Sequence, residues 1–77
     1  MITRAEQLEL LAEDISRAEK AGLVTMIKYP NDTHCGEFLI ADAAVTRDVL
    51  IELLEYLRQA YPDIRLTLID RSIYYGL

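Results

Sequence analysis

Three neighbouring residues carry the side chains of this chain that are best suited to metal or thiol chemistry. Asp32, His34 and Cys35 are all possible metal ligands, and the imidazole could activate the adjacent thiol. The spacing argues against both roles, because structural zinc sites need a distant second pair of ligands, and a catalytic cysteine works with a distant histidine that a third group orients. No second histidine exists. We therefore predict no metal, no cofactor and no catalytic residue, with a small-ligand, thiol or metal site at the His34–Cys35 loop as an alternative.

The other polar groups of the chain also do not indicate a catalytic site. Asp70, Arg71 and Ser72 combine an acid, a cation and a hydroxyl, but no base is placed to activate the serine, so these residues predict a turn. Paired carboxylates can catalyse acid–base steps when their surroundings separate their pKa values, yet the acids here fall on helix faces that look solvated. The three glycines are too scattered to cradle a phosphate. The sequence therefore predicts a protein that is not an enzyme.

Length and charge narrow the class of partner. The 77 residues predict a single domain over 1–77, with 52% hydrophobic residues and a net charge of −5. A negative field repels phosphate backbones, so nucleic acid is disfavoured as a partner. A core of this size rarely contributes more than about 3–5 kcal/mol of net stability. Self-association is therefore expected from size alone.

Cysteine usage and hydropathy indicate the compartment. Cys35 is the only cysteine, so no internal disulfide can form, which favours a reducing environment. The first residues lack a basic region followed by an apolar run. No stretch approaches the roughly 18 apolar residues that cross a membrane. We expect a cytoplasmic protein without a membrane partner.

Two amphipathic helices are predicted. The first covers residues 4–21, between a capping box at Thr3 and Glu6 and a helix-ending glycine, Gly22. The second is capped by Asp42 or Thr46 and ends at Pro62. Its apolar arc is so wide that we expect it to contact both the sheet and the first helix.

Four strands are predicted at residues 23–29, 37–41, 64–69 and 73–77, the first two joined by a loop over 30–36. A right-handed crossover through the second helix should make the second and third strands parallel. The expected fold class is α+β, in the order α-β-β-α-β-β: a two-layer sandwich with both helices on one face of a four-stranded mixed sheet. The predicted core is Leu8, Leu11, Ile15, Ile27, Phe38, Ile40, Val49, Leu53, Leu57, Leu66 and Leu68.

With both helices on one face, the other face of the sheet stays open. We expect it to show Arg65, Thr67, Ile69 and Tyr74, with Met26 and Lys28 nearby. Aromatic and basic side chains on an open sheet can stack single-stranded RNA, but the glycine–aromatic signature of that fold is absent. A protein interface, and self-association in particular, is the favoured interpretation.

Two apolar residues interrupt the acidic helix faces. Leu10 stands among Glu6, Glu9 and Glu13, and Ile51 stands among Asp48, Glu52 and Glu55. Apolar side chains inside a charged rim suit a basic partner, although single exposed ones are also normal.

We therefore predict a non-enzymatic protein-binding module, a homodimer, that binds a macromolecular partner through the open sheet face or the acidic helix faces. An alternative is a small acidic inhibitor of the phage-encoded kind, which blocks the nucleic-acid-binding surface of a host protein. The candidate binding residues lie on both helices and on the open sheet face, namely Glu9, Leu10, Glu13, Ile51, Glu52, Glu55, Arg65, Ile69 and Tyr74.

Overall fold

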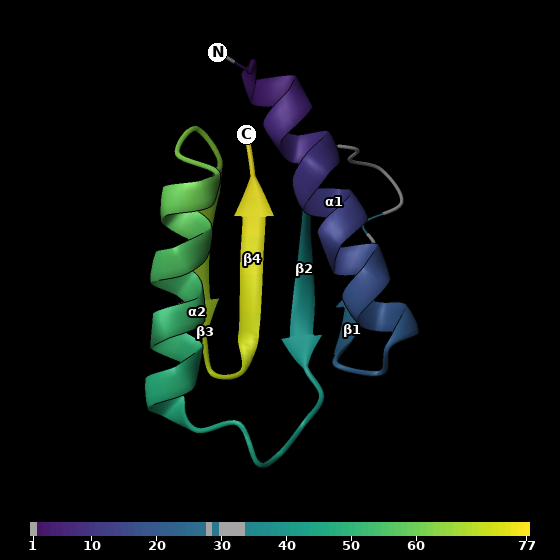
Figure 1. Cartoon of the computed structure of the whole chain (residues 1–77), viewed down its shortest axis with the longest axis vertical. Helices are drawn as coiled ribbons and strands as arrows, with labels where there is room; N and C mark the ends of the chain where they lie inside the picture. The colour runs from purple at the N-terminus through teal and green to yellow at the C-terminus, as the bar shows by residue number, and fades with distance from the viewer. Residues whose placement is uncertain (1, 28, 30–33) are drawn as a thin grey trace.

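The computed structural model describes residues 2–27, 29 and 34–77. Within them the chain forms two helices and one four-stranded sheet (Figure 1). The elements are α1 (Arg4–Lys20), β1 (Val24–Ile27), β2 (Cys35–Ile40), α2 (Arg47–Ala60), β3 (Arg65–Ile69) and β4 (Ser72–Gly76). The predicted α+β class is confirmed.

Local capping sets both ends of α1. The Thr3 hydroxyl accepts the Glu6 N–H at 3.1 Å, and a Glu6 carboxylate oxygen accepts the Thr3 N–H at 3.2 Å, as predicted. After the helix, Gly22 has a φ of 79°, a left-handed conformation that favours glycine. The Leu23 N–H then donates to the Ala18 carbonyl at 3.0 Å, which satisfies a carbonyl of the last turn.

Of the two candidate caps of α2, the structure uses Thr46. Its hydroxyl accepts the Val49 N–H at 3.4 Å. The Asp42 carboxylate instead accepts the Ala44 N–H at 2.9 Å, in the loop before the helix. The helix ends before Pro62, as predicted.

The strand order is β1-β2-β4-β3, and every neighbouring pair is antiparallel. The predicted mixed sheet is therefore wrong. Strands β2 and β3 do run in the same direction, because each is antiparallel to β4, but β4 lies between them (Figure 1). The register pairs Ile69 with Ser72, so the tight turn holds β4 beside β3, and Ile73 is 0% exposed on this inner strand.

Both helices lie over the same face of the sheet (Figure 1), with α1 in contact with β1 and α2 in contact with β3. Leu11 of α1, Leu50 of α2 and Ile73 of β4 are the large side chains that are almost fully buried where these elements meet. The core therefore lies between the helices and one sheet face.

Two predicted core residues are wrong. Ile27 is 41% exposed, because Val24 and Met26 occupy the covered face of β1 and a strand alternates its side chains. Val49 is 47% exposed, because it lines a groove beside α2 that α1 does not fill. The other predicted residues are buried or pack against the core, and the buried residues that the prediction missed are Val24, Leu50, Leu54, Tyr61, Ile64 and Ile73.

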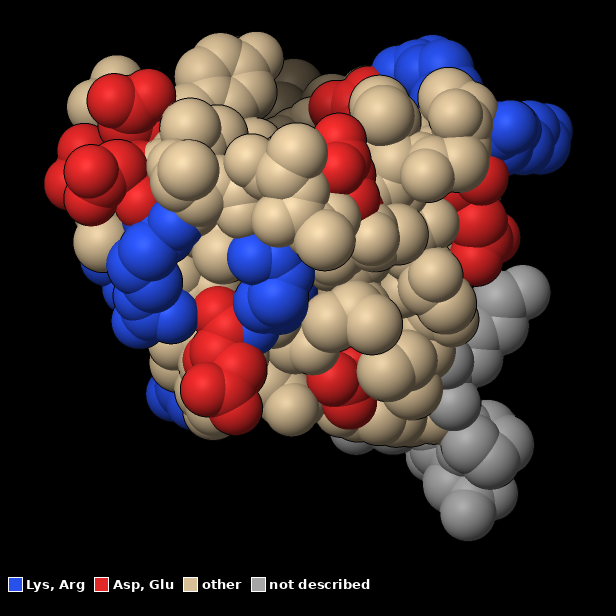
Figure 2. Space-filling view, turned by 90° about the horizontal axis from the view of Figure 1, so that it is seen from below, with Lys and Arg blue, Asp and Glu red and all other residues tan. Residues whose placement is uncertain are grey.

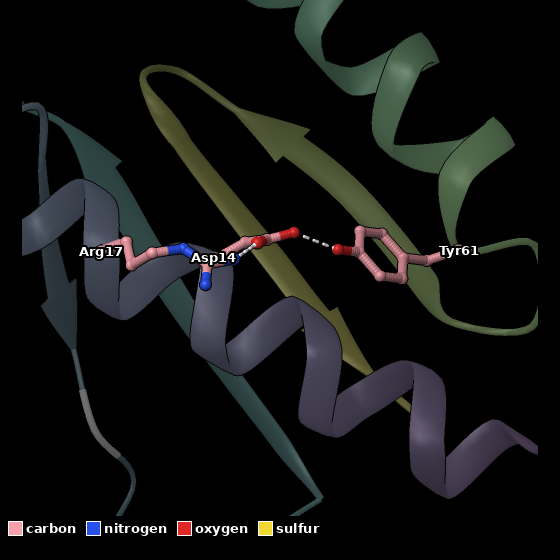
Figure 3. Close-up of polar contacts among 3 residues, drawn as sticks. All are labelled: Asp14, Arg17 and Tyr61. Atoms are coloured by element: carbon pink, nitrogen blue, oxygen red, sulfur yellow. Dashed lines mark hydrogen bonds and ion pairs between the residues drawn. The ribbon is translucent and has the colours of Figure 1, made fainter.

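Among the described residues, the expected contact between α1 and α2 is present, but their backbones do not run close together along the length of the helices. Side chains near the end of α2 link them instead. The Gln7 side-chain amide donates to Asp63 at 2.9 Å, and its oxygen accepts the Asp63 N–H at 3.0 Å. In the second link the Tyr61 hydroxyl donates to Asp14, which also pairs with Arg17 (Figure 3).

The second link shifts two pKa values in opposite directions. The hydrogen bond from Tyr61, with help from Arg17, lowers the pKa of Asp14 below 3.8, although burial opposes this change. Burial and the bond to Asp14 raise the pKa of Tyr61 from 10.0 to about 12. The folded chain therefore favours the ionised carboxylate and the protonated phenol.

Replacing Tyr61 with phenylalanine should lower the free energy of unfolding by about 1 kcal/mol at neutral pH. A hydrogen bond to a charged group contributes about 1.5–3 kcal/mol, and solvent around the half-exposed Asp14 carboxylate reduces that value. Urea unfolding followed by circular dichroism measures the change. The matched control is Tyr56→Phe, at a ring that is 67% exposed, which should change stability by less than about 0.5 kcal/mol.

The difference between wild type and Tyr61→Phe should depend on pH. The Asp14 pKa is lowered by folding, so its contribution is present above pH 3.8 and is lost as pH falls through the folded pKa. The Tyr61 pKa is raised, so its contribution is present below pH 10.0 and is lost between there and about 12. A difference that stays constant through both ranges would contradict the assignment.

Candidate functional site

The uncovered side of the sheet is built from alternate residues of all four strands. The register aligns three rows across it: Thr25, Leu39, Ser72 and Ile69; Ile27, Glu37, Tyr74 and Thr67; and Cys35, Gly76 and Arg65. These residues share one face because strand side chains alternate, and the helices cover the opposite face. We call this set of three rows the open face.

The open face mixes large aliphatic side chains with polar ones, and its charges are balanced. Its large aliphatic side chains are Leu39, Ile27 and Ile69, which are 37%, 41% and 54% exposed. Its charged residues are one acid, Glu37, and one base, Arg65. A face without net charge, in a chain of net charge −5, stands apart from the acidic helices.

Two residues were expected beside the open face, and the structure describes one of them. Met26 packs against the core on the covered side of β1, because its neighbours Thr25 and Ile27 take the uncovered side. Lys28 lies outside the described residues.

Glu37 organises the polar centre of this face. The Tyr29 hydroxyl donates to a Glu37 carboxylate oxygen at 2.6 Å, and Tyr74 lies opposite Glu37 in the register. The bond to Glu37 raises the pKa of Tyr29 to about 12, and the negative charge of Glu37 raises the pKa of Tyr74. Both phenols therefore hold their protons more tightly, the opposite of what a tyrosine base requires.

Replacing Glu37 with glutamine should lower the pKa values of Tyr29 and Tyr74 toward 10.0, because the amide keeps an acceptor but removes the negative charge. An ultraviolet absorbance titration of the tyrosines measures this shift. Glu55→Gln, on the exposed surface of α2, removes the same charge elsewhere and should leave the titration unchanged. Identical curves for Glu37→Gln and wild type would show that Glu37 does not set these values.

A shallow hollow of about 340 Å³ adjoins one end of the open face. His34, Cys35, Arg65 and Tyr74 are among its lining residues. Cys35 belongs to strand β2, although the sequence placed it in the loop. Asp32, the third candidate ligand, lies outside the described residues, and within those residues no three His, Cys, Asp or Glu side chains form a metal-binding group.

The candidate binding residues fall on three separate surfaces. Leu10 is 44% exposed on α1 with Glu9 and Glu13, and Ile51 is 40% exposed on α2 with Glu52 and Glu55. The structure places Arg65, Ile69 and Tyr74 on the open face, on the other side of the sheet. At the end of the molecule in Figure 2, acidic side chains stand in several groups with uncharged surface between them.

Helix side chains cap both edges of the sheet, which the sequence did not reveal. Glu19 accepts the Met26 N–H of β1 at 3.0 Å, and Arg58 donates to the Leu66 carbonyl of β3 at 3.0 Å. Free edge groups are what an added strand binds. Each bond therefore occupies one backbone group that an added strand would otherwise use.

Arg71 has a structural role that the sequence did not indicate. Its guanidinium donates to the carbonyls of Val45 at 2.9 Å and Asp42 at 2.5 Å, while Arg47 donates to the Asp70 carbonyl at 2.9 Å. These bonds fasten the loop before α2 to the β3–β4 turn. No local sequence pattern predicts these hydrogen bonds, because the partners are far apart in the chain.

Neither helix in the described part of the chain is long and apolar enough to cross a membrane. The chain matches no protein-family model, no curated protein and no solved structure. Its surfaces are therefore the basis for assigning a function.

Proposed function

We propose that this chain is a non-enzymatic protein-binding module that forms a homodimer through the open face. The observation that carries the proposal is a sheet face without net charge on which Ile27 and Leu39 are exposed on neighbouring strands, with Ile69 exposed on the far edge strand beyond Ser72. Clustered apolar side chains on a protein surface mark interaction sites. The single cysteine supports a cytoplasmic location.

Charge favours a second copy of the chain as the occupant. Two copies that met through their acidic helix faces would bring like charges together, which opposes association. Among the described residues of the open face, the charged ones are Glu37 and Arg65, whose charges cancel. A two-fold interface, which uses the same patch on both copies, is therefore not opposed by net charge there.

The size of the face predicts a weak dimer. Four strands spaced about 4.8 Å apart and five residues at about 3.4 Å give a face of roughly 20 by 17 Å. Two such faces, of roughly 340 Å² each, would bury about 700 Å² in total, which is below the range of about 1,200–2,000 Å² for stable complexes and in the range of weak, transient ones. We therefore expect a dissociation constant in the micromolar range.

Sedimentation equilibrium tests the proposal. Between about 1 µM and about 500 µM, the mean mass should rise from the 8.8 kDa of one chain toward twice that value. A mass that stays at 8.8 kDa over this range would rule out the homodimer.

A further inference from the structure

A groove of about 550 Å³ lies between α1 and α2, on the opposite side of the sheet from the open face. Phe38 of β2 lines it, with Leu11 and Ile15 on the α1 side and Val49 and Leu53 on the α2 side. The groove exists because the two helices are joined near the end of α2 and do not pack along their length (Figure 1).

Exposed apolar side chains gather at this groove. Its lining includes three exposed apolar side chains, Tyr56, Leu23 and Val49, which are 67%, 56% and 47% exposed. Together with Ile69 on the open face, they are the most exposed large apolar side chains of the described residues. The groove is therefore a second apolar surface, separate from the proposed dimer interface.

The charge around the groove is negative. The charged residues that line it are Asp14 and Asp42. Glu52 lies three residues after Val49 and four before Tyr56, so helical spacing places it beside the groove-lining side of α2. Two cations are nearby: Arg17 pairs with Asp14, and the Arg71 guanidinium donates to the carbonyls of Val45 and Asp42. The three acids Asp14, Asp42 and Glu52 therefore outnumber these cations by one, and Glu52 is the acid that is not adjacent to either of them. Charge complementarity therefore favours a cationic occupant.

Backbone hydrogen bonding favours a helical occupant. Strand β2, below the groove, is paired with β1 on one side and β4 on the other, so it offers no free edge to an extended peptide. A segment that enters an apolar groove must satisfy its own N–H and C=O groups, and a helix does so internally.

We propose that this groove binds a cationic amphipathic helix of a partner protein. The apolar side of that helix would lie against Phe38, Leu53 and Tyr56, and its lysine or arginine side chains would lie along the acidic side of α2. The groove and the open face are on opposite sides of the sheet, so a homodimer would keep both grooves accessible.

A synthetic peptide of about 18 residues provides the probe, with leucines at helical spacings of three and four and lysines elsewhere. Binding of the fluorescently labelled peptide is measured by anisotropy. We expect saturable micromolar binding, weakened at least about tenfold when the same residues are shuffled to remove the apolar face. Tyr56→Lys and Glu52→Lys, at two exposed positions, should each weaken it.

Leu39→Lys on the open face is the matched control and should leave peptide binding unchanged, even where it disrupts the dimer. Equal binding of the shuffled peptide, unchanged binding by folded Tyr56→Lys and Glu52→Lys, or no wild-type binding at about 1 mM peptide would overturn the proposal. None of these results would alter the sedimentation test of the homodimer, so the two proposals can fail independently.

Discussion

Replacing Ile73 with alanine is expected to unfold a large fraction of the molecules at room temperature. Ile73 is 0% exposed, and it pairs with Phe38 on one side and Leu68 on the other. Truncating such a side chain costs about 2–5 kcal/mol, whereas a domain of this size rarely has more than about 3–5 kcal/mol of net stability. Urea unfolding followed by circular dichroism measures the loss.

Ile51→Ala is the matched control for this prediction. Ile51 is 40% exposed on α2, and alanine is a good helix former, so its replacement should cost less than about 1 kcal/mol. A urea midpoint for Ile73→Ala equal to that of wild type would contradict the placement of β4 in the centre of the sheet.

Replacing Leu39 with lysine should dissociate the homodimer. A two-fold interface repeats each contact, so a loss of about 1.4 kcal/mol in each copy raises the dissociation constant about 100-fold. Glu37 lies two residues away on the same face and can offset the new charge within the folded chain. Sedimentation equilibrium measures the change.

Tyr56→Lys adds the same charge on the helix side and should leave the dimer intact, because Tyr56 lines the groove rather than the open face. Equal weakening by both variants would point to a general charge effect. Unchanged dimerisation by folded Leu39→Lys would exclude the open face as the interface.

Features encoded by neighbouring residues could be predicted from the sequence. The capping box at Thr3 and Glu6 and the left-handed Gly22 depend on hydrogen bonds and backbone preferences within a few residues. The helix boundaries followed from them. Alternation along β3 likewise placed Arg65 and Ile69 on one face.

Features that depend on distant contacts could not be predicted in this way. Local pattern does not say whether β4 lies inside or outside β3, so the sheet order was missed. Ile27 was assigned to the core because the sequence of a short apolar strand does not reveal which set of alternate side chains is buried. The groove was missed because the distance between α1 and α2 depends on how each helix packs on the sheet.

The central claim is that two copies of this chain meet through the open face, and backbone amide NMR spectra recorded on dilution test it most directly. Between about 1 mM and about 20 µM, we predict concentration-dependent shifts at Leu39, Thr67 and Ile69, while Leu10 and Ile51 on the helices stay unchanged. Shifts confined to the helices, or spectra that do not change on dilution, would contradict the account.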